Sequence, residues 1–145
     1  MDSVRPWLFI GKYRETQDYV LLKAANIGAM LQLAEEVRQP GIAVLYLPVT
    51  DGETLLPATL RRGLDFVLSQ QCEGKNVLIA CGAGISRAAT FTIAALKEAE
   101  QLTLTDAARC VRHAHPESMP HPSLWASLCA YYGEPLSYKA ILAEW

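Results

Sequence analysis

Four short, unbroken apolar runs constrain the fold of this chain more than any other feature. They cover residues 7–11, 29–33, 43–49 and 77–81, and each is bounded by Gly, Pro, Asn or charged residues. Such runs are typical of strands buried on both faces of a sheet. Helical periodicity covers residues 16–25, 55–70, 87–100, 105–115 and 122–132. The alternation predicts an α/β fold with a central, mostly parallel, twisted sheet flanked by helices and a helical C-terminal half.

The composition fits one domain over residues 1–145. Of the 145 residues, 51% are hydrophobic and 19% are charged, which is enough for a core without metals or cross-links. Thirteen Lys and Arg against fifteen Asp and Glu give a net charge of −2, so we expect neither nucleic acid nor a membrane as a partner. There is no signal-like N-terminal segment and no apolar run of about 18 residues. We therefore expect a cytoplasmic monomer whose four cysteines are free thiols.

The stretch from Cys81 to Arg87 carries the chemistry. A buried strand ends at Cys81, a loop with Gly82 and Gly84 follows, and an alanine-rich helix begins near Arg87. Glycines allow a tight turn with inward N–H groups, and the helix N-terminus adds partial positive charge at the same place. The Arg87 guanidinium adds donors for two oxyanion oxygens. The sequence therefore predicts a phosphate-binding loop.

Cys81 is the candidate nucleophile of this loop. Helix N-termini and nearby cations favour the thiolate, which is the reactive form of cysteine. A cysteine at the end of a buried strand is more often a packing residue. The Gly-x-Gly loop and an arginine six residues later, Arg87, favour the nucleophile instead.

This segment resembles the signature loop of the dual-specificity branch of the protein tyrosine phosphatases. It matches Cys-x5-Arg and has the Gly-x-Ser-Arg ending. Residues 7–11 (WLFIG) look like the opening strand of that family, and residues 49–51 (VTD) fall where its general-acid loop should be. Residues 119–124 (MPHPSL) resemble the Pro-rich entry to its last core helices. The resemblance covers nearly the whole chain and implies a protein tyrosine phosphatase-like fold.

The resemblance implies a protein phosphatase that hydrolyses phosphotyrosine, and also phosphoserine or phosphothreonine, through a phosphocysteine, without metal or organic cofactor. Cys81 would attack phosphorus, Arg87 would bind the phosphate and its transition state, and Asp51 would act as general acid and then base. The implied phosphate-binding residues are Gly82, Ala83, Gly84, Ile85, Ser86 and Arg87. The expected partners are phosphorylated proteins, with phosphate or other oxyanions in the loop.

The role of Asp51 depends on this resemblance. Asp51-Gly52 by itself is typical of a plain turn. Its position, thirty residues before Cys81 (81 minus 51), favours the catalytic role. Glu53 is the spare carboxylate.

Two positions depart from the family pattern. The residue before the nucleophile is usually His and here is Ala80, so the thiolate is less favoured. The residue after the signature Arg is usually Ser or Thr, whose hydroxyl stabilises the departing thiolate, and here it is Ala88. We expect the second chemical step to be slow relative to the first. Ser86 is expected to brace the loop and Thr90 to bond back within its helix, so neither replaces the lost hydroxyl.

The loop also bears on the substrate. It has no Lys or His between Gly82 and Ser86, which disfavours a multiply phosphorylated lipid. Ile85 offers apolar contact to an aromatic ring, which favours phosphotyrosine without excluding the other phosphoresidues.

Two other functions stay open. A pseudophosphatase would bind phosphoproteins with little turnover, and turnover abolished by Cys81→Ser would exclude it. A rhodanese-like sulfurtransferase or an arsenate reductase-like thiol enzyme would also use a loop cysteine. A rhodanese-like site would not require Asp51, so loss of activity in Asp51→Asn would argue against it.

The histidines and Cys110 are candidate metal ligands or loop braces. Cys110, His113 and His115 form C-x2-H-x-H, but they lack a fourth ligand and converge poorly on a helix, so we expect no metal. His121 is expected to brace a loop through hydrogen bonds.

Cys72 and Cys129 fall in apolar helical settings and are expected to be core thiols. Each is a candidate for a disulfide with an oxidised Cys81.

Several large side chains follow helical patterns. We expect Trp125, Tyr131 and Tyr132 to pack in or near the core. Arg61 and Arg62 are expected on a solvated helix face, with docking of an acidic phosphopeptide as the less favoured alternative.

Overall fold

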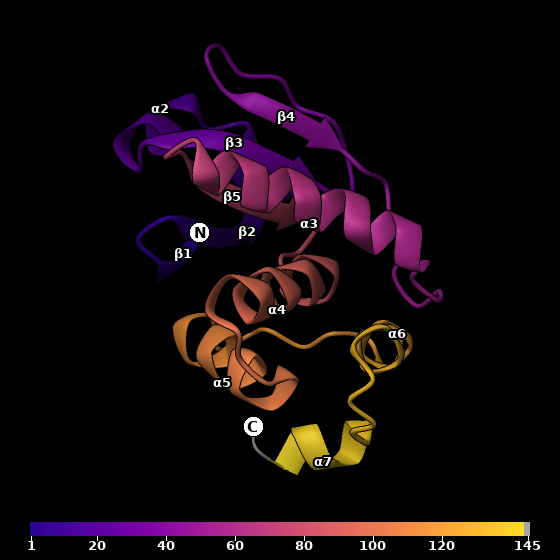
Figure 1. Ribbon diagram of the computed structural model, residues 1–145. Coiled ribbons are helices and arrows are strands. Elements are labelled where there is room, and N and C mark those ends of the chain that lie inside the picture. Colours follow the sequence, from indigo (N-terminus) through magenta and orange to yellow (C-terminus); the bar gives the residue numbers. More distant parts are fainter. Residues whose placement is uncertain (144–145) are drawn as a thin grey trace.

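A five-stranded sheet lies at the centre of the structure, a computed structural model that describes residues 1–143 (Figure 1). The strands are β1 (Asp2–Arg5), β2 (Leu8–Lys12), β3 (Ile27–Gln32), β4 (Ala43–Tyr46) and β5 (Asn76–Cys81). Their order across the sheet is β1-β2-β5-β3-β4. Strands β2 to β5 run parallel, and β1 pairs antiparallel with β2 at one edge. The predicted mostly parallel sheet is confirmed.

Strand β5 occupies the middle of the sheet and is paired on both sides. Ala80 pairs with Gly11 of β2 and with Gln32 of β3. Because successive side chains of a strand point to opposite faces, Ala80 joins a small core on one face and Cys81 joins the large core on the other. Cys81 is the last residue of β5, so it lies at the carboxyl edge of the parallel strands. Ligands of open α/β sheets bind at this edge.

Helices cover both faces of the sheet. They are α1 (Tyr13–Thr16), α2 (Tyr19–Ala24), α3 (Pro57–Cys72), α4 (Arg87–Glu100), α5 (Leu104–Ala114), α6 (Pro122–Tyr132) and α7 (Tyr138–Ala143). Leu22 of α2 packs in the small core, whereas α3 and α4 pack on the large-core face. Helix α4 lies between the sheet and the pair α5 and α6 (Figure 1), which explains why its residues 88–96 are all buried. The helical C-terminal half is confirmed.

Helices α3 and α4 approach closely at Gly63. A Cβ at Gly63 would lie 2.5 Å from Cε1 of Phe91, a fully buried ring of α4. On either side of this contact, α3 buries Leu60, Leu64 and Val67 at helical spacing. The glycine therefore supplies the space for the aromatic ring that joins the two helices to the sheet.

Some element predictions were wrong at the edges. The run 43–49 forms a strand only over Ala43–Tyr46 and is half-buried, because β4 is an edge strand with one neighbour. The predicted helix 16–25 forms only over Tyr19–Ala24 (α2), because the Asp18 side chain accepts the Leu21 N–H and caps this helix, whereas Thr16 is the last residue of the separate helix α1. Strand β1 and helix α7 were not predicted. Within residues 1–143, no helix combines the length and apolar character needed to cross a membrane.

Candidate active site

Residues 82–86, named here the cradle loop, join β5 to α4. Gly84 has φ +70°, and a Cβ at this position would lie 2.8 Å from the carbonyl oxygen of Gly11. Both the left-handed backbone and the close approach of β2 require glycine here. Helix α4 begins directly after the loop at Arg87, so its N-terminal partial charge faces the loop.

Three segments distant in sequence bind the carbonyl groups of the cradle loop. The pairs are the Tyr13 amide with the Gly82 oxygen at 3.3 Å, the Met119 amide with the Ile85 oxygen at 2.9 Å, and Nε2 of His115 with the Gly84 oxygen at 2.8 Å. The loop is therefore held from α1, from the end of α5 and from the entry to α6.

These bonds orient the amide groups of the loop. In a trans peptide the carbonyl and the following N–H point in opposite directions, and residues 1–143 contain no cis peptide. Carbonyls bonded outward therefore turn the N–H groups of Ala83, Ile85 and Ser86 to the other side, away from these partners. We find no hydrogen bond from these three amides to another group in the described part of the chain. Backbone amides without a protein partner are typical of anion-binding loops, so the cradle loop is a candidate anion site.

Cys81 lies at the base of the cradle loop and is 3% exposed. Its Sγ accepts the Ala88 N–H at 3.4 Å, in the first turn of the 14-residue helix α4. A backbone donor and the helix N-terminus both stabilise negative charge on this sulfur. The sequence-predicted nucleophile is thus placed beside the sequence-predicted anion site.

Arg87 extends from the first residue of α4 across the loop. Its Nη1 donates to the Val49 carbonyl at 3.0 Å. Its Nη2 lies 3.4 Å from where a Cβ of Gly82 would be. The guanidinium therefore lies against the cradle loop and is fixed by the segment that leads to Asp51.

Asp51 is linked to the cradle loop by a single hydroxyl. Ser86 Oγ donates to Asp51 Oδ1 at 2.6 Å and accepts the His121 N–H at 2.8 Å. Sequence reasoning expected Ser86 and His121 to act as braces, and both do. The His121 brace is made by its backbone, while its ring accepts the Ser123 N–H and begins α6.

Residues 50–54, named here the acid loop, are exposed. Glu53 is held through its backbone carbonyl, which accepts from Ser123 Oγ at 3.3 Å. Asp51, and not Glu53, is the carboxylate whose side chain is bonded to the cradle loop. This distinguishes the two candidate acids by position.

The phenol side chain of Tyr13 lies in a hollow beside Cys81. Tyr13, Glu35 and Ala80 line a hollow next to Cys81. Burial and the neighbouring Glu35 carboxylate raise the pKa of Tyr13, so its hydroxyl stays protonated at neutral pH. Ala80 brings no polar group to this hollow.

The position of the missing hydroxyl is occupied by Ala88, which is fully buried. The nearby hydroxyls of α4 are engaged within the helix: Thr90 Oγ1 donates to the Ser86 carbonyl at 2.8 Å, as predicted, and Thr92 Oγ1 donates to the Ala88 carbonyl at 2.7 Å. In the family pattern a hydroxyl of residue 88 faces the sulfur. Here Cys81 Sγ receives the backbone N–H of Ala88 instead.

An apolar pocket of about 240 Å³ adjoins the acid loop and the cradle loop. Ile85 and Met119 line it with large exposed apolar side chains, and Tyr138 closes one side with its hydroxyl bonded to the Pro120 carbonyl at 2.8 Å. Met119 and Tyr138 were not predicted as site residues. Their distance in sequence from Cys81 left no local signal.

His115 is the main residue that sequence reasoning missed. The C-x2-H-x-H pattern groups it with Cys110 and His113, yet its ring bonds to Asp2 and to Gly84, whereas Cys110 Sγ lies 3.9 Å from Arg5 Nη2. Asp2 and Gly84 are 113 and 31 residues away from His115, so no spacing within α5 could reveal the contact.

Two other predictions need correction. Cys72 is exposed, because it is the last residue of α3 and lies beyond the buried stripe of that helix. Arg61 is half-buried, with its guanidinium bonded to Glu98 and Asp65.

The remaining packing predictions are confirmed. Cys129 and Trp125 are buried, and Tyr131 and Tyr132 are half-buried against the large core. Burial and the Glu98 carboxylate raise the pKa of Tyr132.

Comparison with known proteins agrees with this geometry. The family model for the dual specificity phosphatase catalytic domain matches residues 8–134. Mouse dual specificity protein phosphatase 19 is 28% identical over 136 residues, which are 88% of this chain and 60% of that protein. Mouse dual specificity protein phosphatase 12 is 32% identical over 123 residues, which are 80% of this chain and 36% of that protein. The chain thus spans less than two thirds of the length of both relatives.

A solved structure extends the similarity over the whole fold. The crystal structure of human DUSP28 has a TM-score of 0.84 and 26% identity, with 100% of both chains covered. The match includes the sheet, the cradle loop and the C-terminal helices. This chain belongs to the dual specificity phosphatase catalytic domain family.

Proposed function

We propose that this chain is a cysteine-dependent phosphatase that hydrolyses phosphomonoesters on protein side chains. The observation that carries the proposal is the placement of Cys81 Sγ under a loop of convergent free amides, beside Arg87 and an acid loop bonded to Ser86. Residues 1–145 would act as one catalytic domain. A monomeric state and a cytoplasmic location stay predictions.

The first chemical step transfers the phosphoryl group to Cys81. The thiolate attacks phosphorus and forms a P–S bond while the P–O bond to the leaving group breaks. Asp51, protonated, gives its proton to the leaving oxygen. The cradle loop amides and Arg87 bind the three equatorial oxygens, where charge lies in a loose transition state.

The second step hydrolyses the phosphocysteine. The Asp51 carboxylate takes a proton from water, the water oxygen attacks phosphorus, and the P–S bond breaks to release inorganic phosphate and the thiolate. The Ala88 N–H at 3.4 Å is a weak donor to the departing sulfur. With no hydroxyl on residue 88, this step limits the overall rate.

An oxyanion ligand is supported by a similar structure. A mouse phosphatase of this type, described as complexed with zinc tungstate, has a TM-score of 0.84 and 28% identity, with 99% of this chain and 89% of that chain covered. Tungstate has the tetrahedral shape and charge of phosphate. We expect the cradle loop of this chain to bind phosphate and tungstate.

The apolar pocket favours phosphotyrosine. Ile85, Met119 and Tyr138 lie beside the acid loop and offer contact to an aryl ring. A tyrosine ring also spans the distance from an exposed peptide to a buried sulfur better than a serine side chain does. We therefore propose phosphotyrosine as the preferred substrate, with phosphoserine and phosphothreonine as slower ones.

A pseudophosphatase is the second candidate, because Ala88 slows the release of the phosphoryl group. The two functions differ in turnover. The rhodanese-like and arsenate reductase-like alternatives are not favoured by the family match.

The test measures hydrolysis of p-nitrophenyl phosphate and of a phosphotyrosine peptide under reducing conditions. We expect steady turnover in the wild type and its loss, on the order of 10³-fold or more, in Cys81→Ser. Cys110→Ser, a change of a half-buried thiol outside the site, is the matched control and should keep full activity. Equal activity of the wild type and Cys81→Ser would refute the proposal that Cys81 is the nucleophile of a phosphatase. Binding of tungstate without turnover in the wild type would favour the pseudophosphatase.

A further inference from the structure

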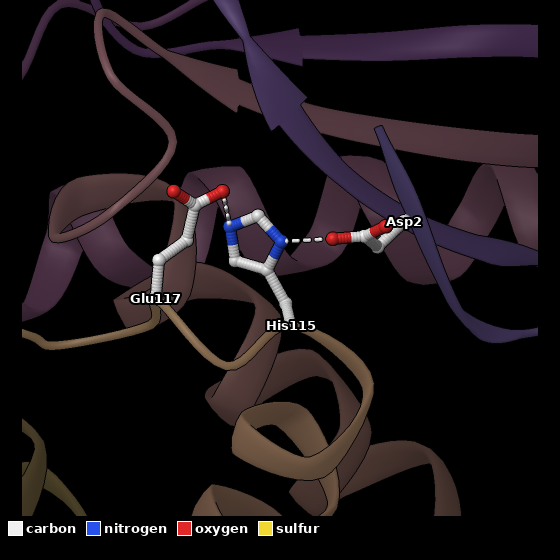
Figure 2. A group of neighbouring side chains, drawn as sticks. All are labelled: Asp2, His115 and Glu117. Carbon is white, nitrogen blue, oxygen red and sulfur yellow. Dashed lines mark hydrogen bonds and ion pairs between the residues drawn. The ribbon is translucent and has the colours of Figure 1, made fainter.

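The His115 ring lies between two oxygen atoms on its two sides. His115 is 1% exposed and ends α5 as its C-cap residue. Nδ1 lies 2.5 Å from Asp2 Oδ2 of β1, and Nε2 lies 2.8 Å from the Gly84 carbonyl oxygen of the cradle loop. Figure 2 shows the ring between Asp2 on one side and Glu117 on the other.

Every group that faces the two ring nitrogens is an acceptor. A carbonyl oxygen and an ionised carboxylate have no proton to donate, and Glu117 Oε1 lies 3.3 Å from Nε2. A neutral imidazole has one N–H, so either tautomer would turn a nitrogen lone pair toward an oxygen lone pair at 2.5 or 2.8 Å. The imidazolium, with two N–H groups, satisfies both contacts.

The surrounding charges favour the same form. Asp2 and Glu117 are the acidic groups that face His115, from β1 and from the segment after α5. The C-terminal end of the 11-residue helix α5 adds partial negative charge. Burial opposes the charge, but both polar hydrogens are bonded, which offsets much of that cost.

A single metal ion does not explain this cluster. Asp2, His115 and Glu117 place one ligand atom each within 4.8 Å of one another. However, Asp2 and Glu117 approach opposite ring nitrogens (Figure 2), and one ion binds one nitrogen of a given ring. Nε2 also already faces the Gly84 oxygen. The cluster is therefore suited to hold a proton.

We propose that His115 is a protonated positioning residue which binds the Gly84 carbonyl and thereby aims the Ile85 N–H at the substrate phosphate. The Gly84 carbonyl and the Ile85 N–H belong to one trans peptide, so a bond that fixes the first orients the second. The imidazolium also adds positive charge behind the anion site. Deprotonation removes one hydrogen bond and this charge, so oxyanion affinity falls as the pH rises. The link to catalysis rests on the proposed phosphatase function, whereas the protonation state does not.

The direct test is ¹⁵N-edited NMR of the imidazole nitrogens in the wild-type protein at neutral pH. We expect His115 to show two protonated nitrogens, and the exposed His113 provides the signal for comparison. His113→Gln and His115→Gln assign the signals. One protonated and one bare nitrogen on His115 would overturn the proposal. This outcome is independent of whether the protein hydrolyses anything.

The functional test measures tungstate affinity in a Cys81→Ser background, which removes titration of the nucleophile. Between about pH 7 and pH 9 tungstate stays a dianion, so a change in affinity reports on the protein. We expect His115→Gln to weaken binding about tenfold at the lower pH, which is the size of one lost charge-assisted hydrogen bond. His113→Gln, two residues away and exposed, should bind as tightly as the parent protein.

The pH profile separates positioning from simple packing. The parent affinity should fall toward the higher pH, and His115→Gln should show little of this fall. His115→Arg keeps a permanent charge and should restore a flat, tight profile. Equal tungstate affinity of the parent and His115→Gln at the lower pH, or a fall with pH that His115→Gln leaves unchanged, would contradict the proposal. If His115→Arg fails to fold, the tungstate affinities of the parent and His115→Gln still test the proposal.

Discussion

The cradle loop and the acid loop lie side by side but are held in different ways. Three carbonyls of the cradle loop are bonded to groups from α1, from the end of α5 and from the segment before α6. The acid loop is exposed, and its reactive side chain is fixed by one hydrogen bond, from Ser86 to Asp51. The proposed anion site is therefore held by the fold itself, while the proposed proton donor, Asp51, depends on the Ser86 hydroxyl of the cradle loop.

This difference suits the proposed chemistry. Donors that bind phosphate oxygens act best when they are oriented before the substrate arrives. The acid must leave room for substrates to enter and then protonate leaving groups of different shape. Changes in the cradle loop should therefore affect all substrates, whereas changes in the acid loop should depend on the leaving group.

The largest effect is expected from Arg87→Lys. Lysine keeps the charge but loses the two-pronged guanidinium, so it cannot bind two phosphate oxygens and the Val49 carbonyl together. We expect kcat/KM to fall on the order of 10³-fold for every substrate. Arg62→Lys, an exposed arginine on α3, is the control and should change little. A fall in kcat/KM for only one leaving group would contradict the claim that the cradle loop acts on all substrates alike.

Asp51→Asn, unlike Arg87→Lys, should reduce activity by an amount that depends on the leaving group. Asparagine cannot give a proton, so kcat/KM for phenyl phosphate should fall about 10²-fold, while kcat/KM for p-nitrophenyl phosphate, whose leaving group needs little protonation, should fall far less. Glu53→Gln in the same loop should behave like the wild type. Equal losses on both substrates would assign Asp51 to binding and not to proton transfer.

Gly84→Ala tests whether tungstate binding requires the observed backbone conformation of the cradle loop. A Cβ would meet the Gly11 carbonyl at 2.8 Å on a backbone with φ +70°. We expect about tenfold weaker tungstate binding together with a stability loss of about 1–3 kcal/mol. Gly74→Ala is a matched control with φ +79° and no atom within 4 Å, so it carries the backbone strain alone. Tungstate titration and thermal melts distinguish the two, and identical tungstate affinity in both variants would show that the cradle loop tolerates displacement.

Ser86→Ala should uncouple the two loops. It removes the 2.6 Å bond to Asp51 and the acceptor of the His121 N–H. We expect kcat/KM for phenyl phosphate to fall about fivefold, with a smaller change for p-nitrophenyl phosphate. Ser69→Ala, an exposed serine of α3, serves as control. An effect as large as that of Arg87→Lys would show that Ser86 binds phosphate itself.

The smallest effect is expected far from both loops, at Glu134. Its bonds to Lys97 and to the Leu104 N–H lower the pKa of the Glu134 carboxyl. A lowered folded-state pKa gives stability that is present above the ordinary value for glutamate and is lost as the pH falls through the folded value. Glu134→Gln should therefore lower stability at neutral pH by less than about 1 kcal/mol and should close the gap to the wild type in acid. Thermal melts and activity assays should show a stability change with unchanged kcat. A large loss of activity would mean that the two loops respond to global stability.

The sequence predicted the elements whose signals are local. Unbroken apolar runs identified β2, β3 and β5, and the motif from Cys81 to Arg87 identified the loop between β5 and α4 as the candidate anion site, because both signals depend on neighbours along the chain. Edge effects were missed. Strand β4 is shorter and more exposed than its apolar run predicted, and Asp18 caps α2, which begins at Tyr19 and not at residue 16 as the periodicity predicted. The carbonyl braces of the cradle loop were also missed. Their partners come from distant segments, and only the tertiary structure shows that His115 meets Gly84.

The central claim is that Cys81 carries the phosphoryl group on a prebuilt anion site and that Ala88 makes its release slow. The most direct measurement is the pre-steady-state release of p-nitrophenol from p-nitrophenyl phosphate, with wild type beside Cys81→Ser and Ala88→Ser under reducing conditions. The account predicts a burst of about one equivalent in the wild type followed by slow turnover, no burst in Cys81→Ser, and a faster steady rate in Ala88→Ser. Linear release from the start in the wild type, with the same steady rate in Ala88→Ser, would contradict it.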